Sequence, residues 1–336
     1  MDYDKVSDKE WEEIILKSDN TYFYSSPTWA KILEKSFDQY RIATRLYHIN
    51  DKSILIPMME KNTHGKRILG FKSYESMPDE GLGGLFSESE ITNEDFKNIV
   101  KDIIGSRHTF YLSLPPFTNP FETKSQPAKT LKNNKWDLKD IGNYTHIVNL
   151  EGKKFEDVQK NYRKDTKRKI RKATKSGVEV REGTTLDDYK AFYNIWSEAS
   201  QNWGYQETYS FKFFQNLHKY GSPHIKLSLA TKDNKTIAGN ISFHYTKTFN
   251  AFYGATMNKY KTFNPISLIY NNLIKQACQK KCKYFNFGHS MGLKGIAMYK
   301  EGFGAEQIET KRYLAVANFA KIPFIIKTIG KSVTSR

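Results

Sequence analysis

The residues best suited to chemistry lie between positions 285 and 306, where glycines and aromatic residues surround a few polar side chains. Lys300 stands among them, directly after Tyr299. We expect this part of the segment to be a strand edge, from which a lysine can hold a phosphate or stabilise a developing oxyanion. The glycines would let the backbone approach a ligand closely. Lys300 is therefore a candidate catalytic residue, and an ordinary surface lysine is the alternative.

His289 and Ser290 follow Gly288 in the same segment. A histidine in a turn near a cleft can act as a general base, and a plain loop histidine is the alternative. Ser290 lacks the G-x-S-x-G elbow and the acidic partner that a serine nucleophile needs. Direct attack by an amine needs a held geometry and a stabilised oxyanion more than a covalent nucleophile. The pattern therefore favours direct transfer, without a covalent enzyme intermediate.

A strongly basic helix is predicted within residues 153–175. From Lys160 to Lys175 its cations are Lys160, Arg163, Lys164, Lys167, Arg168, Lys169, Arg171, Lys172 and Lys175, and the only acid there is Asp165. Like charges three or four residues apart on a helix repel one another. An anion that neutralises them would stabilise the helix, so we expect contact with phosphates of a nucleotide, a lipid pyrophosphate or tRNA. A solvated basic face is the alternative.

The whole chain is basic, with 53 Lys and Arg against 36 Asp and Glu and a net charge of +17. Such a surface attracts nucleic acid, anionic lipid headgroups or nucleotide substrates. The only cysteines are Cys278 and Cys282, and no second Cys or His pair stands at zinc spacing, so we expect no metal site. We also expect a cytoplasmic protein, peripheral at most to the inner face of the membrane, because no apolar signal region or run of about 18 apolar residues occurs.

The order of the predicted elements indicates an α+β fold. Two helices are expected at 186–200 and 210–220, followed by strands at 225–231, 236–245 and 250–256 that form an antiparallel meander. Asn264 is expected to cap the next helix, with Pro265 in its first turn. We place one domain at 1–145 and a second at 146–317. A basic amphipathic tail, 318–336, could lie on a membrane surface or pack on its own domain.

Several motifs, taken together, resemble the FemABX-type branch of the GNAT acyltransferase superfamily. They are the R-K and G-V-E-V run at 171–180, I-A-G-N-I at 237–241, Tyr253-Gly254, Asn264-Pro265, F-N-F-G-H-S at 285–290 and Y-K-E-G-F-G-A-E at 299–306, with W-A-K at 29–31 and G-L-G-G at 81–84 upstream. Each motif is weak by itself. Their order and spacing carry the resemblance, which extends over nearly the whole chain.

This resemblance implies two tandem GNAT-like domains, with mixed, largely antiparallel central sheets flanked by helices, the first on the acceptor-binding side. The family transfers an amino acid from aminoacyl-tRNA to an amine of a peptidoglycan precursor, and close relatives look like acyltransferases on amino sugars. Lys300 and Tyr299 match the family's aromatic–lysine pair near the transferred group. The expected substrate-binding residues are Lys31, Lys175 and Tyr253, which match phosphate-holding positions, together with Lys169, Arg171 and Asn264.

The donor is the point at which the sequence departs from its GNAT relatives. CoA-dependent members hold the pyrophosphate with Q/R-x-x-G-x-G/A at a helix N-terminus, whereas residues 260–265 here lack those glycines. We therefore favour aminoacyl-tRNA over acyl-CoA as the donor, a nucleotide- or lipid-linked envelope precursor as the acceptor, and no cofactor. A CoA-dependent N-acyltransferase on an amino sugar or nucleotide sugar is the first alternative. A non-catalytic module that binds nucleic acid or anionic lipid through the basic helix is the second.

Overall fold

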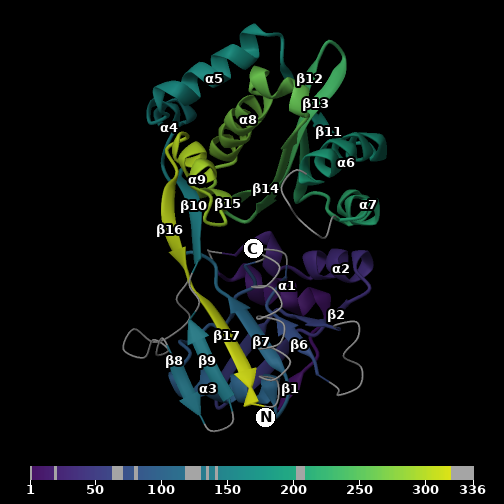
Figure 1. Ribbon diagram of the computed structural model, residues 1–336. Helices are drawn as coiled ribbons and strands as arrows, with labels where there is room; N and C mark the ends of the chain where they lie inside the picture. The colour runs from purple at the N-terminus through teal and green to yellow at the C-terminus, as the bar shows by residue number, and fades with distance from the viewer. Residues whose placement is uncertain are drawn as a thin grey trace, which may run out of the picture. The chain divides into compact units, whose positions relative to one another are not determined.

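The computed structural model describes most of the chain, in two compact units (Figure 1). The described residues are 2–18, 21–62, 71–78, 82–117, 130–133, 136–140, 143–201 and 209–318. The first unit ends at Asn143 and resumes at Glu309, and the second covers Tyr144–Ile308. Each unit contains one seven-stranded sheet, mixed and largely antiparallel, together with helices. This arrangement confirms the predicted α+β class.

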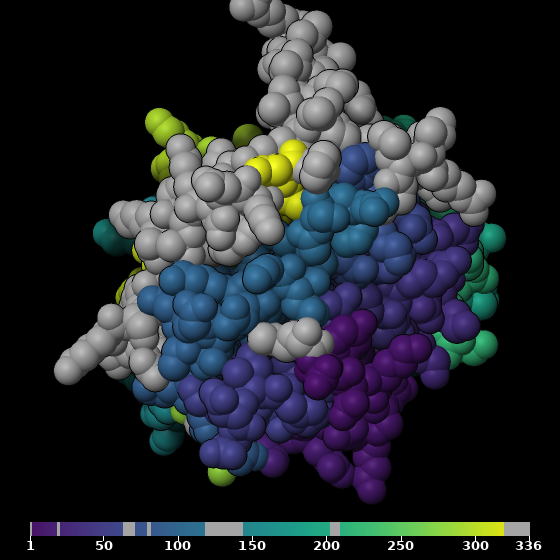
Figure 2. Space-filling model, turned by 90° about the horizontal axis from the view of Figure 1, so that it is seen from below, coloured from purple at the N-terminus to yellow at the C-terminus, as the bar shows by residue number. Residues whose placement is uncertain are grey.

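The first unit is built on a sheet of order β2-β5-β6-β7-β17-β9-β8, with a second, three-stranded sheet of order β1-β3-β4. Its elements are β1 (Tyr3–Asp4), α1 (Asp8–Leu16), η1 (Phe23–Ser25), α2 (Pro27–Ser36), β2 (Tyr40–Ile42), β3 (Arg45–Ile49), β4 (Lys52–Ile56), β5 (Met59–Lys61), β6 (Ser73–Glu75), α3 (Asn93–Ile104), β7 (Thr109–Ser113), β8 (Thr130–Asn133), β9 (Trp136–Asp140) and β17 (Arg312–Ala317). In Figure 2 the purple N-terminal residues lie against the violet-blue surface of the residues that follow them, as the β1–β3 pairing requires.

The second unit is built on a sheet of order β11-β12-β13-β14-β15-β10-β16. Its elements are β10 (Asn143–Asn149), α4 (Phe155–Lys160), α5 (Lys164–Lys175), β11 (Glu179–Gly183), α6 (Leu186–Gln201), α7 (Phe211–Tyr220), β12 (Ile225–Lys232), β13 (Lys235–Tyr245), β14 (Thr248–Thr256), η3 (Asn258–Phe263), α8 (Pro265–Gln279), β15 (Tyr284–His289), α9 (Lys294–Glu301) and β16 (Glu306–Thr310). Strands β12, β13 and β14 form the predicted antiparallel meander.

Helices cover both faces of this second sheet, α8 on one side and α6 with α7 on the other (Figure 1). Two glycines in adjacent strands mark the two faces. A Cβ at Gly254 would lie 3.0 Å from the hydroxyl of Tyr270 on α8, whereas a Cβ at Gly239 would lie 2.4 Å from the ring of Phe192 on α6. Glycine is therefore needed at 239, where the helix packs too closely for any side chain.

The course of the chain differs from the predicted domain division at its C-terminal end. The predicted boundary near 145 lies close to the observed change of unit at Asn143–Tyr144. The predicted second domain, however, ran on to residue 317, whereas β17 pairs with β7 and β9 in the sheet of the first unit. A strand pattern in the sequence identifies a strand but not its partners, so this return could not be predicted. Apart from Asn318, the predicted tail lies outside the described residues.

The predicted basic helix is also interrupted. Instead of one helix over 153–175, the chain forms α4 and α5 separated by a turn at 161–163. In that turn Tyr162 is buried against the ring of Phe303, and the backbone N–H of Arg163 donates to the carbonyl of Gly302. Packing of this turn against the end of α9 therefore outweighs the helical tendency of the segment.

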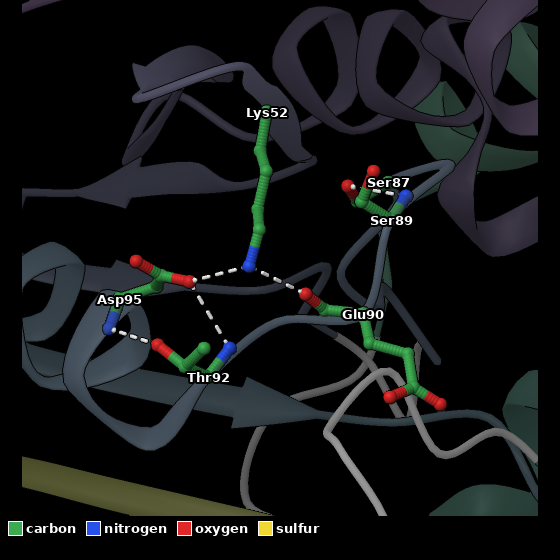
Figure 3. Close-up of polar contacts among 6 residues, drawn as sticks. All are labelled: Lys52, Ser87, Ser89, Glu90, Thr92 and Asp95. Atoms are coloured by element: carbon green, nitrogen blue, oxygen red, sulfur yellow. Dashed lines mark hydrogen bonds and ion pairs between the residues drawn. The ribbon is translucent and has the colours of Figure 1, made fainter.

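Helix α3 provides much of the core of the first unit and begins with a capping box (Figure 3). The Thr92 hydroxyl accepts from the N–H of Asp95 at 3.0 Å, and an Asp95 carboxylate oxygen accepts from the N–H of Thr92 at 3.1 Å. Lys52 on β4 donates to the same oxygen at 3.1 Å and to the carbonyl of Glu90 at 2.8 Å. Although partial burial opposes it, this set of donors lowers the pKa of Asp95. Lys52 thus connects the capping box of α3 to β4, an edge strand of the three-stranded sheet.

Thr92→Ala is expected to lower the free energy of unfolding by about 1 kcal/mol, because it removes the acceptor for one helix N–H. Thr92→Ser keeps that oxygen and should retain most of the stability. Urea denaturation followed by circular dichroism measures both variants. Equal midpoints for Thr92→Ala and the wild type would contradict a stabilising role for the cap.

Candidate active site

The candidate site lies where β14 and β15 stop pairing with each other. These two strands are parallel and pair over three residues only, from Thr248 opposite Tyr284 to Asn250 opposite Asn286. Beyond this short seam β14 continues along β13, and β15 continues along β10. The end of β15 is held by the Asn286 carboxamide oxygen, which accepts from the Thr145 hydroxyl at 2.6 Å and from the N–H of Gly288 at 2.7 Å. A fixed, polar strand end therefore faces the point of divergence.

Lys300 is buried at this strand end. Its side chain is 8% exposed, and its ammonium donates to the carbonyls of Gly288 at 2.9 Å and His289 at 2.6 Å. The prediction of a strand edge is wrong for this residue, because Lys300 occupies the last turn of helix α9. A buried ammonium is tolerated only when acceptors surround it, and the two carbonyls supply them. The result is a positive charge held in one place.

Tyr299 points away from Lys300, toward helix α8. Its hydroxyl lies 2.8 Å from that of Ser267, and its ring packs against those of Tyr270 and Phe303. Burial raises the pKa of Tyr299 well above its ordinary value, so the phenol stays neutral. The ammonium of Lys169 lies 5.5 Å from the centre of the same ring. Tyr299, on α9, thus contacts both α8 and α5. The residue of α5 that it contacts, Lys169, is one of the predicted substrate-binding residues.

The side chain of His289 is held by a backbone carbonyl of the neighbouring strand β10. Its Nδ1 lies 2.7 Å from the carbonyl oxygen of Tyr144 and must carry the proton of that hydrogen bond. In the neutral ring Nε2 is then the basic nitrogen, which is the state a general base needs. The structure therefore brings Lys300 and His289 together, since the lysine binds the histidine's own carbonyl.

A second histidine, His146, lies beside this cluster and was not predicted. It is 2% exposed, and its Nδ1 is 3.1 Å from the hydroxyl of Ser290. Its Nε2 is buried and has no hydrogen-bond partner among the described residues. Burial lowers the pKa of His146, and the charge of Lys300 lowers it further. The two partners are 144 residues apart, and no local motif relates them, so the sequence contains no signal for this pair.

Buried polar atoms of β13 and β14 also lack partners within the described part of the chain. Both side-chain polar atoms of Asn240 are unpaired, as is the carboxamide oxygen of Asn250. Asn240 is fully buried opposite Gly254, and Asn250 is the last β14 residue paired with β15. Most buried polar groups in folded proteins have partners. The unpaired oxygen of Asn250, at the end of the pairing between β14 and β15, is a polar group that a ligand there could use.

The remaining predicted binding residues lie on different surfaces. Arg171 and Lys175 are exposed on α5. Tyr253 faces α6 and α7, where its hydroxyl donates to that of Tyr209 at 2.7 Å and its ring packs against Trp196. Lys31 is exposed on α2, in the first unit. The predicted roles of these four residues in substrate binding stay predictions.

Asn264 stands at the predicted N-cap position but does not cap. Its backbone is left-handed, with φ of 56°, and its side chain donates to the carbonyl of Thr262 at 3.2 Å. The preceding η3 turn places the chain in this conformation, so the side chain points back along the loop instead of toward the first turn of α8. The prediction of an N-cap hydrogen bond from Asn264 is therefore wrong.

Among the described residues, no group of three or more His, Cys, Asp or Glu side chains is arranged to hold a metal ion. Within the same residues, no helix has both the length and the apolar composition to cross a bilayer.

The second unit matches a known enzyme domain. Residues 160–301 match the family described as acetyltransferase (GNAT) domain. This segment contains α5, the meander, α8 and the turn of Lys300, so the second unit resembles a GNAT acetyltransferase domain, as the sequence predicted. No curated protein sequence matches the chain.

Solved structures extend the likeness to both units. FemX has a TM-score of 0.65 at 10% identity, covering 93% of this chain and 97% of that one. The C-terminal domain of a putative lysylphosphatidylglycerol synthetase from Agrobacterium fabrum has a TM-score of 0.56 at 12% identity, covering 94% and 93%. L-PGS from Bacillus licheniformis has a TM-score of 0.54 at 10% identity, covering 93% and 98%. At these identities the likeness shows the fold, and it confirms the predicted FemABX-type resemblance.

His146 should make stability depend on pH. Because its folded pKa lies below the ordinary value of about 6.5, stability that is present above that pH is lost as the pH falls toward the folded pKa. His146→Gln should reduce the slope of unfolding free energy against pH by up to about 1.4 kcal/mol per pH unit. Ser290→Ala should keep the steep slope, because burial is the main cause of the shift. Urea denaturation at a series of pH values is the measurement, and equal slopes for His146→Gln and the wild type would contradict the assignment.

Proposed function

We propose that this protein transfers an aminoacyl or acyl group to the amine of a cell-envelope precursor, and that aminoacyl-tRNA is its preferred donor over acyl-CoA. The observation that carries the proposal is the buried ammonium of Lys300, fixed by two carbonyls at the end of β15. The GNAT domain at 160–301 supports the reaction class. The names of the structural neighbours, FemX and lysylphosphatidylglycerol synthetase, support an aminoacyl group and an envelope acceptor.

The proposed chemistry is direct attack of the acceptor amine on the donor ester. The nitrogen forms a bond to the carbonyl carbon, and negative charge develops on the carbonyl oxygen. A positive charge that is already in place stabilises this oxyanion without reorganisation at the moment of reaction. The ester C–O bond then breaks, and the amine's proton passes to the leaving ribose hydroxyl. His289 is the proposed carrier of that proton, through Nε2.

The loop before α8 supports the choice of donor. A CoA pyrophosphate cradle needs several backbone N–H groups that point inward at a helix N-terminus. Here Pro265 has no N–H to give, and the N–H of Ser267 donates to the carbonyl of Asn264 at 3.1 Å. The η3 turn occupies the place of the glycine-rich loop. The first turn of α8 therefore offers little to a pyrophosphate.

The basic face of α5 supports a polyanionic substrate. Its one acid, Asp165, pairs with Arg168 at 2.6 Å and Lys169 at 2.8 Å. Among the described residues, Lys164, Lys172 and Lys175 have no acidic partner within ion-pair distance and are exposed. Phosphates of tRNA or of a nucleotide- or lipid-linked acceptor would relieve this repulsion. We propose Lys169, Arg171 and Lys175 as binding residues for such phosphates.

Lys300→Ala should lower kcat by roughly 10²–10³-fold, the usual effect of removing one oxyanion donor, and leave KM nearly unchanged. Mass-spectrometric detection of the acyl-transfer product is the assay, and Lys275→Ala, an exposed lysine on α8, is the control. The variant also leaves two carbonyls without their donor, so circular dichroism must show that it is folded. A folded variant with wild-type kcat would contradict the role of Lys300.

Acetyl-CoA should bind weakly or not at all. Isothermal titration calorimetry measures this directly, and parallel assays with acetyl-CoA and charged tRNA compare the two as donors. We expect turnover with charged tRNA only, because the first turn of α8 lacks inward N–H groups. A dissociation constant for acetyl-CoA in the low micromolar range, with product formed from it, would establish the CoA-dependent alternative instead.

A further inference from the structure

Exposed apolar side chains gather in one short part of the second unit. Met291, Leu293, Ile296 and Met298, called here the apolar segment, are 56%, 55%, 41% and 61% exposed. The other exposed large apolar residues of the described chain are Tyr3, Leu16, Ile42, Phe117, Tyr144 and Leu186, which are far apart in sequence. Single exposed apolar residues are ordinary, but a contiguous group usually marks an interaction surface.

The backbone presents this segment to solvent. Gly288, Met291 and Gly292 have φ values of 75°, 50° and 74°, so the chain turns sharply between the end of β15 and the start of α9. A Cβ at Gly292 or Gly295 would meet nothing within 4 Å. Lys300, in the last turn, is the only buried residue of α9. The helix is therefore anchored at its C-terminal end, and its beginning projects from the unit.

Positive charge accompanies the apolar segment. Residues 291–299 contain Lys294 and no acid. At the far end of α9, an Arg163 guanidinium nitrogen lies 3.5 Å from the carbonyl of Met298, and Arg163 pairs with Glu301 at 2.8 Å. Arg163 immediately precedes α5, whose exposed lysines have no acidic partners among the described residues. The apolar segment thus adjoins the N-terminal end of α5, where its basic face begins.

We propose that the apolar segment and the adjoining basic face of α5 together form a docking surface for an anionic lipid bilayer. Aliphatic side chains enter the boundary between headgroups and acyl chains, and the neighbouring cations meet lipid phosphates. The proposal goes beyond the proposed function and does not depend on it. Docking would place the turn that carries Lys300 at the bilayer surface, where a lipid-linked acceptor is presented.

Two other occupants fit the surface less well. Nucleic acid would be bound by the cations of α5 alone, and single strands stack on aromatic side chains, whereas the four exposed residues of the segment are aliphatic or thioether. A second copy of the chain would bring together two surfaces of the same sign on molecules of net charge +17. An anionic bilayer accounts for both the apolar side chains and the charge.

Flotation with vesicles tests the proposal, using phosphatidylcholine alone and phosphatidylcholine with phosphatidylglycerol, without any donor or acceptor substrate. Wild-type protein should float only with the anionic vesicles, and added salt should weaken the binding. The double variant Leu293→Ser/Met298→Ser should bind at least about tenfold more weakly. The matched control Leu16→Ser/Leu186→Ser removes two exposed leucines elsewhere, 50% and 41% exposed, and should bind as the wild type does.

Several outcomes would overturn the proposal. Equal vesicle binding by the wild type and the Leu293→Ser/Met298→Ser variant would show that the segment does not touch the bilayer. Sedimentation velocity that finds a wild-type dimer and a monomeric variant would assign the segment to contact between copies. Loss of tRNA binding in the variant, with no vesicle binding by the wild type, would assign it to nucleic acid. None of these results depends on the activity of Lys300→Ala, so failure here and failure of the proposed reaction are distinguishable.

Discussion

The burial of one ammonium group constrains the arrangement of the candidate site. Moving a charge out of water is costly unless hydrogen-bond acceptors replace the water. Lys300 meets this requirement only because the chain turns at Gly288, with φ of 75°, and presents the carbonyls of residues 288 and 289 toward α9. The last turn of α9, the end of β15 and the Asn286 carboxamide that holds it must therefore form together. A shift in any of them would leave the charge without its acceptors.

The same charge affects its neighbours. A positive group inside the fold disfavours a second one nearby, which is one reason that the pKa of His146 is lowered. Burial and this charge thus favour the neutral form of the His146 ring, which lies in the same cluster as the ammonium of Lys300. Such a set separates the two tasks of acyl transfer. The lysine can stabilise negative charge, while a neutral ring can accept a proton.

The sequence allowed the local elements to be predicted better than their long-range partners. Short polar turns separate β12, β13 and β14, so both the strands and their antiparallel pairing followed from the pattern, and Pro265 correctly marked the start of α8. The pairing of β17 with strands of the first sheet could not be predicted, because alternating side chains indicate a strand but not the strands it pairs with. Part of the long-range arrangement was still predicted, because the order of the FemABX-type motifs indicated an α+β protein of two units.

The site was predictable to a smaller extent. Lys300 was correctly singled out from its aromatic and glycine neighbours, but its helix was taken for a strand edge, because Gly295 and Tyr299 are poor helix formers on their own. The ammonium of Lys300 anchors the last turn of this helix to the end of β15, and helix propensity does not include such a contact. The pairing joins His146, inside β10, with Ser290, directly after β15, and only the three-dimensional fold brings them together.

The faces of the second sheet limit how the predicted binding residues can cooperate. Side chains of successive strand residues point to opposite faces, so Tyr253 faces α6 and α7, while Gly254 next to it faces α8. A ligand on the α8 side, where Tyr299 is held, cannot meet the Tyr253 hydroxyl through a continuous sheet. The continuity ends after Asn250 and Asn286, the last paired residues of β14 and β15. Any single substrate that uses residues of both faces must therefore bind where these strands diverge, next to the carbonyls that hold Lys300.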